Sequence, residues 1–157
     1  MGDVIASLRN ADGSIAIDGF YDNVQPLPEE VRAQWQSLPF DDEGFLNDVG
    51  LSIPAGETDF PVLEQVWARP SCEIHGLWGG YMGDGFKTVI PAKAHAKISF
   101  RLVDGQDPEK VREAFKAHVR KTIPADCSVT FTDVAAAPAT VMALDSPFLR
   151  KSLGGLT

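Results

Sequence analysis

The stretch AHAKISFRLVDGQDPEKVREAFKAHVRK, residues 94–121, decides the fold. Apolar and polar residues alternate over 94–103, and this period of two is typical of a half-buried strand. A turn at DGQD follows, after which Asp107 is expected to cap a helix that begins at Pro108. Apolar residues recur at helical spacing along that helix, and basic residues in its last turn suit the helix dipole. The stretch therefore predicts a strand followed by a helix that covers a sheet.

Two other segments show the same alternation. Residues 71–78, SCEIHGLW, place Cys72 and Ile74 inward, and residues 127–133, CSVTFTD, place Cys127 inward. The order strand, strand, helix, strand predicts an α+β fold, an antiparallel sheet with helices on one face and a polar opposite face. Both cysteines are expected to be buried free thiols, because they form no CxxC pair or metal-type cluster.

A glycine-rich run, GGYMGDGFKTVIPAKA, connects the first two predicted strands. It has neither the GK[ST] ending of a phosphate-binding loop nor the GxGxxG spacing of a dinucleotide site. Its glycines are typical of turn residues in a hairpin connection.

The first 70 residues follow a different sequence pattern, with turns expected at Gly13 and Gly19. Short helices are predicted over 28–38 and 41–50, and 51–70 is expected to be a loop. A last helix is expected to start at Asp145 or Ser146, and because it begins where the sequence stops, truncation is expected. Three segments are predicted. Residues 1–70 are the end of the first helix with an acidic helical insertion, and residues 71–134 are a core of sheet and helix. Residues 135–157 are a linker and the start of a helix that leads to an absent catalytic segment.

Charge and hydropathy narrow the class of function. Lys and Arg number 14 against 22 Asp and Glu, a net charge of -8 that disfavours nucleic-acid binding. The sequence contains no apolar run of membrane-spanning length and no signal-peptide pattern at its start, so a soluble cytoplasmic protein is expected.

The residues that could carry chemistry form no recognisable catalytic set. The three histidines, His75, His95 and His118, belong to no HxH or HExxH pattern, and no serine lies in a GxSxG motif. Thr88 offers a hydroxyl in the loop, and Arg101 offers a guanidinium fork suited to a carboxylate. Thr88 and Arg101 thus indicate a binding site rather than a catalytic site.

Residues 79–111, from GGYMGDGFKTVIPAKA through AKISFRLV to DGQDPEKV, closely resemble the lid domain of metallopeptidase family twenty. These are the dinuclear-zinc amidohydrolases that include carnosinase-type dipeptidases and aminoacylases. Residues 12–24 resemble a dipeptidase-type insertion before the lid core. The resemblance implies a ferredoxin-like sheet, strand-helix-strand-strand-helix-strand. Compared with this order of elements, residues 1–9 resemble the end of the first helix, and the first strand is expected to be absent.

The resemblance also implies a function. Thr88 and Arg101 match the substrate-binding positions of the family lid, which also carries the dimer contact and so implies a homodimer. The family's two zinc ions and its catalytic residues lie in segments that this sequence does not match, so no catalytic residue and no metal ligand is assigned here. The expected function is a lid and dimerisation fragment of a zinc-dependent dipeptidase or amidohydrolase that cleaves peptide or acyl-amino acid bonds.

Two alternatives are retained. The chain could be a free-standing regulatory module that holds a small carboxylate through Arg101. It could also be an independent enzyme with unrecognised chemistry, which would require turnover that survives chelation and is lost on a point change in the chain.

Overall fold

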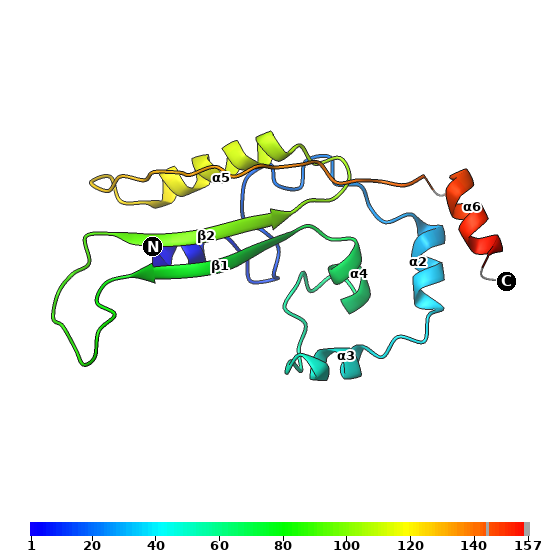
Figure 1. Cartoon of the computed structure of the whole chain (residues 1–157), viewed down its shortest axis with the longest axis horizontal. Helices are drawn as coiled ribbons and strands as arrows, with labels where there is room; N and C mark the ends of the chain where they lie inside the picture. The colour runs from blue at the N-terminus through cyan, green and yellow to red at the C-terminus, as the bar shows by residue number, and fades with distance from the viewer. Residues whose placement is uncertain (144, 156–157) are drawn as a thin grey trace.

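The computed structural model describes residues 1–143 and 145–155, so that Leu144, Leu156 and Thr157 of the predicted 135–157 segment lie outside the described residues. Figure 1 shows a long two-stranded hairpin with one helix beside it and a group of short helices near one end of the hairpin. The elements are α1 (Gly2–Ala6), α2 (Glu29–Gln36), α3 (Asp42–Asp48), α4 (Val62–Trp67), β1 (Ser71–Gly79), β2 (Ala94–Arg101), α5 (Pro108–Thr122) and α6 (Pro147–Gly154). None of the described helices is long and apolar enough to cross a bilayer.

The sheet consists, in the described residues, of β1 and β2 paired antiparallel. Ser71 lies opposite Arg101 and Cys72 opposite Phe100, and the register shifts between Ile74 and Gly76. Residues 80–93 form the connection at the far end of the hairpin (Figure 1). The alternation of the sequence predicted both strands and the glycine-rich run predicted their connection, and the structure confirms these predictions.

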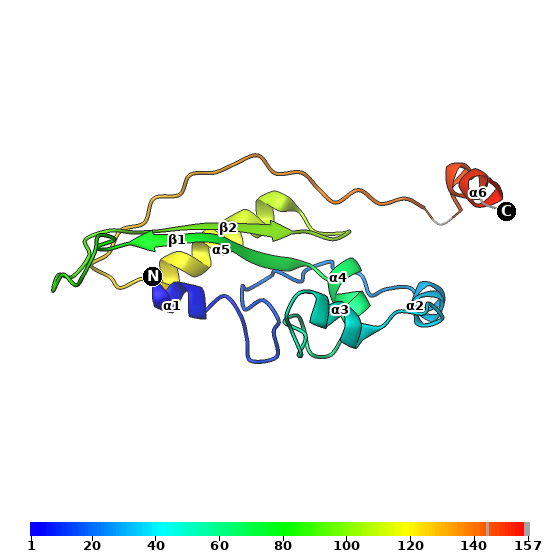
Figure 2. The ribbon, with the colours of Figure 1, turned by 60° about the horizontal axis from the view of Figure 1, so that its bottom comes forward.

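The helix α5 packs on the apolar face of the hairpin, and α1 contacts it on the same side (Figure 2). The Phe115 ring on α5 lies 5.4 Å from the Phe100 ring on β2, and Phe20 lies 5.7 Å from Phe100 on another side. Cys72 is buried in this cluster, as predicted. The structure confirms the α+β fold of the ferredoxin-like lid type, with its helices against one face of the sheet.

The N-terminus of α5 is capped as the sequence predicted. The Asp107 carboxylate accepts hydrogen bonds from the backbone N–H groups of Glu109 and Lys110, and Pro108 occupies the first helical position. A cap of this kind satisfies N–H groups that have no partner within the helix. The turn before it is fixed by the buried side chain of Gln106, whose Nε2 donates to the carbonyl oxygen of Phe20 at 2.6 Å.

The predicted strand over 127–133 is wrong, because this segment is extended but pairs with neither described strand. It lies along α5, where Lys116 contacts Asp133 at 2.7 Å and the Phe115 and Phe131 rings are 6.2 Å apart. Cys127, which the same pattern placed inward, is exposed. Alternation predicts an extended backbone, but a strand also needs a neighbour to complete its hydrogen bonds, and α5 offers only side chains.

The helical insertion confirms two predictions and corrects one. Helices α2 and α3 form where short helices were expected, and the Asp41 carboxylate caps α3 by accepting from the Gly44 N–H. The expected loop over 51–70 instead contains α4, which buries Val62 and Leu63. Arg32 of α2 pairs with Glu64 of α4 at 3.2 Å, so the two helices are held together.

A partly buried polar cluster of Tyr21, Glu57 and Arg69 links residues 15–21 to residues 57–69. Tyr21 Oη accepts from the backbone N–H of Ile15 at 2.8 Å and donates to Glu57 at 2.7 Å. Arg69 pairs with the other Glu57 oxygen at 2.7 Å and lies over the Phe60 ring. Burial is the main cause that raises the pKa of Tyr21 to about 12. Residues 15–21 and residues 57–69 are therefore held together by contacts between side chains distant in the sequence.

Candidate functional site

The sheet face opposite α5 is mostly polar, as the sequence predicted, with Trp78 at the end near the hairpin connection. Because side chains alternate between the two faces of a strand, the same face receives residues from both strands at regular intervals. From the hairpin connection to the open end, these residues include Trp78, His95, Lys97, His75, Ser99, Glu73 and Arg101.

Glu73 is the centre of the polar contacts on this face. It accepts a hydrogen bond from Ser71 and a longer one, 3.5 Å, from Ser99. Ser99 Oγ also lies 2.5 Å from His75 Nε2. Since the Ser99 hydroxyl donates to Glu73, it accepts from the N–H of His75 in this arrangement. The carboxylate contacts the serine and not the histidine, so the order of a Ser-His-acid triad is absent here.

Arg101 lies at the open end of the hairpin and projects into solvent. Its side chain is 85% exposed, and its Nε lies 3.7 Å from Oε1 of Glu73. Among the described residues the guanidinium has no other ion-pair or hydrogen-bond partner. Its terminal nitrogens are therefore free to bind a carboxylate in the forked geometry that arginine favours.

Thr88 lies within residues 80–93, the exposed connection between the strands. Figure 1 shows this connection at the end of the hairpin where β1 finishes and β2 begins, whereas Arg101 ends β2. The length of this eight-residue strand therefore separates the connection from Arg101. At about 3.4 Å per residue, β2 alone spans roughly 24 Å, several times the length of a dipeptide. The structure does not bring the two predicted binding residues of one chain together.

The histidines are likewise dispersed. His75 bonds Ser99, His95 stacks on Trp78 with ring centroids 5.1 Å apart, and His118 on α5 lies 2.8 Å from Ser7 Oγ. In the described residues no group of three or more His, Cys, Asp or Glu side chains is placed to hold a metal ion.

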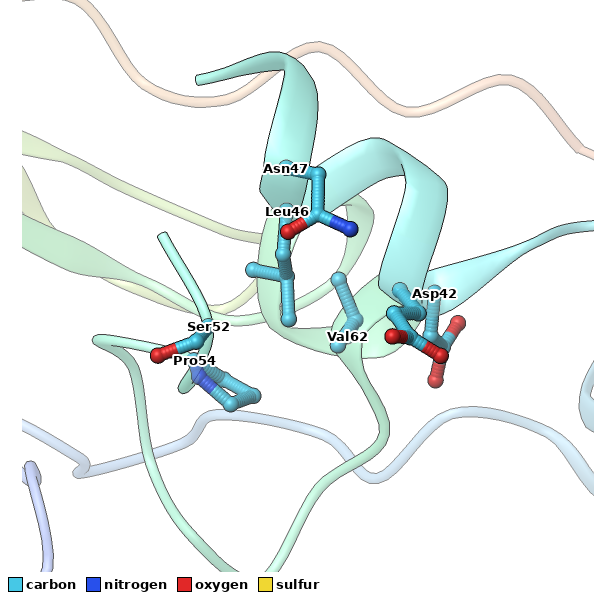
Figure 3. Close-up of a pocket in the computed structure, with 7 residues that line it drawn as sticks. Asp42, Leu46, Asn47, Ser52, Pro54 and Val62 are labelled. Atoms are coloured by element: carbon cyan, nitrogen blue, oxygen red, sulfur yellow. The ribbon is translucent and has the colours of Figure 1, made fainter. Parts of the chain in front are cut away.

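A hollow of about 340 Å³ lies in the insertion, away from the hairpin (Figure 3). Leu46 and Val62 form its apolar wall, with Pro54 across from them and Asp42 at the rim. Its charged lining is acidic, and Thr88 and Arg101 contribute nothing to it. The predicted binding residues therefore lie on open surface rather than in this hollow.

A family model described as "Peptidase dimerisation domain" matches residues 1–127. The chain belongs to this family. The match covers the hairpin, α5 and the whole insertion, and so confirms the resemblance drawn from residues 79–111. The chain is thus a dimerisation domain of the M20 metallopeptidases.

Curated relatives agree with this assignment. The Cys-Gly metallodipeptidase DUG1 of Saccharomyces cerevisiae is 35% identical over 115 residues, which cover 73% of this chain and 24% of that protein. The human Beta-Ala-His dipeptidase is 33% identical over 122 residues, which cover 76% of this chain and 24% of that protein. The chain therefore spans about a quarter of the length of these relatives.

Solved structures share the fold of the dimerisation domain. An M20 family metallo-carboxypeptidase from Sulfolobus solfataricus superposes with a TM-score of 0.66 at 36% identity, covering 77% of this chain and 28% of the other. Human carnosine dipeptidase 1 superposes with a TM-score of 0.66 at 31% identity, covering 76% and 26%.

Sequence reasoning placed Arg101 on the polar face but did not single out Glu73 as its neighbour. The signal was present, because an antiparallel hairpin that pairs Ser71 with Arg101 also pairs Glu73 with Ser99 on the same face. Aligning the two alternating segments by their inward residues Cys72 and Phe100 finds that register.

Proposed function

We propose that this domain acts as the lid of a zinc-dependent dipeptidase or amidohydrolase, holding substrate and joining two subunits while the metal chemistry occurs elsewhere. The observation that carries the proposal is the family match over residues 1–127. The parent would hydrolyse a peptide or acyl-amino acid amide bond, as the names of the dipeptidase relatives suggest.

The substrate-binding part of the proposal rests on Arg101 and Thr88. Arg101 presents free terminal nitrogens at the open end of the sheet face, which suits a terminal carboxylate. Thr88 presents a hydroxyl in the exposed connection. Since one ligand cannot span the hairpin, the two residues would serve different ends of the lid.

A homodimer is supported by the apolar surface of the hairpin tip, defined as residues 77–90. Large side chains there are exposed: Leu77, Trp78, Tyr81, Met82, Phe86, Val89 and Ile90. Several exposed apolar side chains within one short segment favour an interaction site there. The described strands also leave backbone groups on their outer edges that a second chain can pair with.

Two zinc ions would belong to the full-length parent, where they would activate water for attack on the amide carbon. In the described part of this chain no cluster of metal-ligating side chains stands ready to hold them. Arg101 and Thr88 would orient the substrate, which lowers the entropic barrier to the metal-assisted step. Catalytic residues of the parent would lie outside this domain.

The three proposed segments differ in role. Residues 1–70 would carry the insertion, 71–134 the sheet and α5, and 135–157 the connection towards a catalytic segment. Two cysteines that form no disulfide, Cys72 and Cys127, support a reducing cytoplasmic location.

Metal content and turnover test the proposal directly. The purified chain is incubated with zinc and desalted, its zinc is measured by plasma emission, and a dipeptidase assay with added zinc is run in parallel. The lid role predicts neither stoichiometric zinc nor turnover. Stoichiometric zinc with turnover would contradict it and would favour an independent enzyme.

A free-standing carboxylate-binding module is the second candidate, favoured by the exposed Arg101 guanidinium. It predicts that this chain, as a monomer, binds an amino acid or dipeptide and that Arg101→Ala abolishes binding without unfolding it. A lid that works only within a dimeric parent predicts self-association as well.

A further inference from the structure

The open end of the polar sheet face carries one positive and one negative group side by side. Arg101 Nε and Glu73 Oε1 lie 3.7 Å apart, and both side chains reach solvent, at 85% and 33% exposure. The next cation on this face, Lys97, lies four residues back along β2, about 13 Å away. Arg101 and Glu73 therefore determine the charge pattern of this end of the face.

One carboxylate oxygen of Glu73 has only a single, long hydrogen-bond contact. Oε1 accepts from Ser71 and faces Arg101, whereas Oε2 receives only the 3.5 Å contact from Ser99. A carboxylate oxygen has room for further donors, and an ammonium group is the strongest donor that a peptide substrate offers.

The spacing suits a short zwitterion. A ligand carboxylate on the terminal nitrogens of Arg101 would sit about 2.8 Å from them. An extended dipeptide spans about 7 Å from its amine to its carboxylate. An ammonium group at that distance can reach the neighbourhood of Glu73, and a second carboxylate placed there would be repelled.

We propose that Glu73 is a specificity-determining residue that selects ligands with a free amino group, while Arg101 holds their carboxylate. The selected class is the unblocked dipeptide, and acyl-amino acids are disfavoured. This inference rests on the proposed carboxylate-binding role of Arg101 and narrows the substrate class of that same face.

Glycylglycine and N-acetylglycine test this selectivity, because the second compound is the first without its ammonium group. Each is titrated at low ionic strength into the ¹⁵N-labelled chain, and the Arg101 Nε–Hε resonance reports binding. The chain is expected to bind glycylglycine about two- to fivefold more tightly, the range of an exposed ion pair. Glu73→Gln should bring the two dissociation constants together, and Glu73→Asp should restore part of the difference.

Glu109→Gln is the matched control, because Glu109 pairs with Arg112 on α5 and its loss changes the net charge of the chain equally. It should leave the preference intact. Binding of both ligands at Arg101 with no preference, or a preference that Glu109→Gln abolishes equally, would overturn the role of Glu73 and leave that of Arg101 standing. No shift of the Arg101 resonance with either ligand would overturn the proposed role of Arg101, and the selectivity with it.

Discussion

Thr88 and Arg101 lie at opposite ends of the hairpin, because β2 runs from the connection that holds Thr88 to Arg101, its last residue. A rigid strand pair keeps them apart in every copy of the chain. If both contact substrate, as proposed, the two residues at one active site come from different subunits. The arrangement links substrate binding to dimer formation and gives a test that needs no structure of the parent.

Mixed dimers of the full-length parent provide that test. Thr88→Ala and Arg101→Ala should each inactivate a homodimer, because every site then lacks one binding group. A dimer with one copy of each variant has one intact site, so random mixing should recover about a quarter of the wild-type activity. Measured activity of co-refolded subunits that stays at the level of either variant alone would show that both residues serve one site from one chain.

The Tyr21 hydroxyl is expected to contribute to folding through two partly buried hydrogen bonds. Tyr21→Phe leaves the Ile15 N–H without its partner and removes a donor from Glu57. We expect a loss of about 1–2 kcal/mol in the free energy of unfolding, measured by urea denaturation. Tyr81→Phe is the control, because the Tyr81 hydroxyl bonds a backbone oxygen in the exposed connection. Equal destabilisation by the two changes would refute the assigned role of Tyr21.

The two thiols should differ sharply in reactivity. Burial is the largest cause that raises the pKa of Cys72 to about 11, so the reactive thiolate is scarce at neutral pH, whereas Cys127 is exposed. Iodoacetamide at pH 8 should label Cys127 rapidly and Cys72 only after unfolding in guanidinium, as read by mass spectrometry. Cys127→Ser should abolish the rapid label, and rapid labelling of both thiols in the folded chain would contradict the placement of Cys72.

The extended segment 129–134 should depend on Asp133. The hydrogen bond from Lys116 is the main cause that lowers the pKa of Asp133 below its ordinary 3.8. Because the folded pKa is the lower one, the contact stabilises the segment above pH 3.8 and is lost as pH falls through the lowered value.

Asp133→Asn should reproduce the effect of acid at neutral pH. We expect reduced ¹⁵N order parameters over 129–134, while α5 keeps its values. Asp126→Asn, in the turn after α5, serves as the control and should leave the segment unchanged. A segment whose order parameters do not respond to Asp133→Asn would be held by its other contacts with α5, which include the Phe115–Phe131 ring pair and the hydrogen bond from Arg112 to the Val134 carbonyl oxygen.

The hairpin and α5 were predictable because their signals are local. The alternation over 94–103, the Asp107 cap and the helical stripe each lie within a few residues of the structure they specify. The helix α4 was missed because its six residues lie between prolines and polar loops, too short for a helical period to show. Its stability comes from burying Val62 and Leu63 against distant parts of the chain.

The places of Arg101 and Thr88 in the fold were predictable, but the contacts between the residues around them were not. The chemistry of Arg101 and its place on the polar face followed from the alternation, and the family resemblance pointed to Thr88. Their separation follows from the predicted strand between them, whereas the contact between Glu73 and Arg101 depends on the register of the hairpin. Register and the partners of 127–133 depend on which elements meet in space, and periodicity does not report that.

Sedimentation equilibrium of the purified chain tests whether the domain self-associates, because a dimerisation lid must associate through surfaces that the structure leaves open. At micromolar concentration we expect a mass of two chains, near twice 17.0 kDa, and a shift towards one chain when Phe86 and Ile90 of the hairpin tip are changed to serine. A single-chain mass for the unmodified protein across the micromolar range would contradict its role as a dimerisation lid.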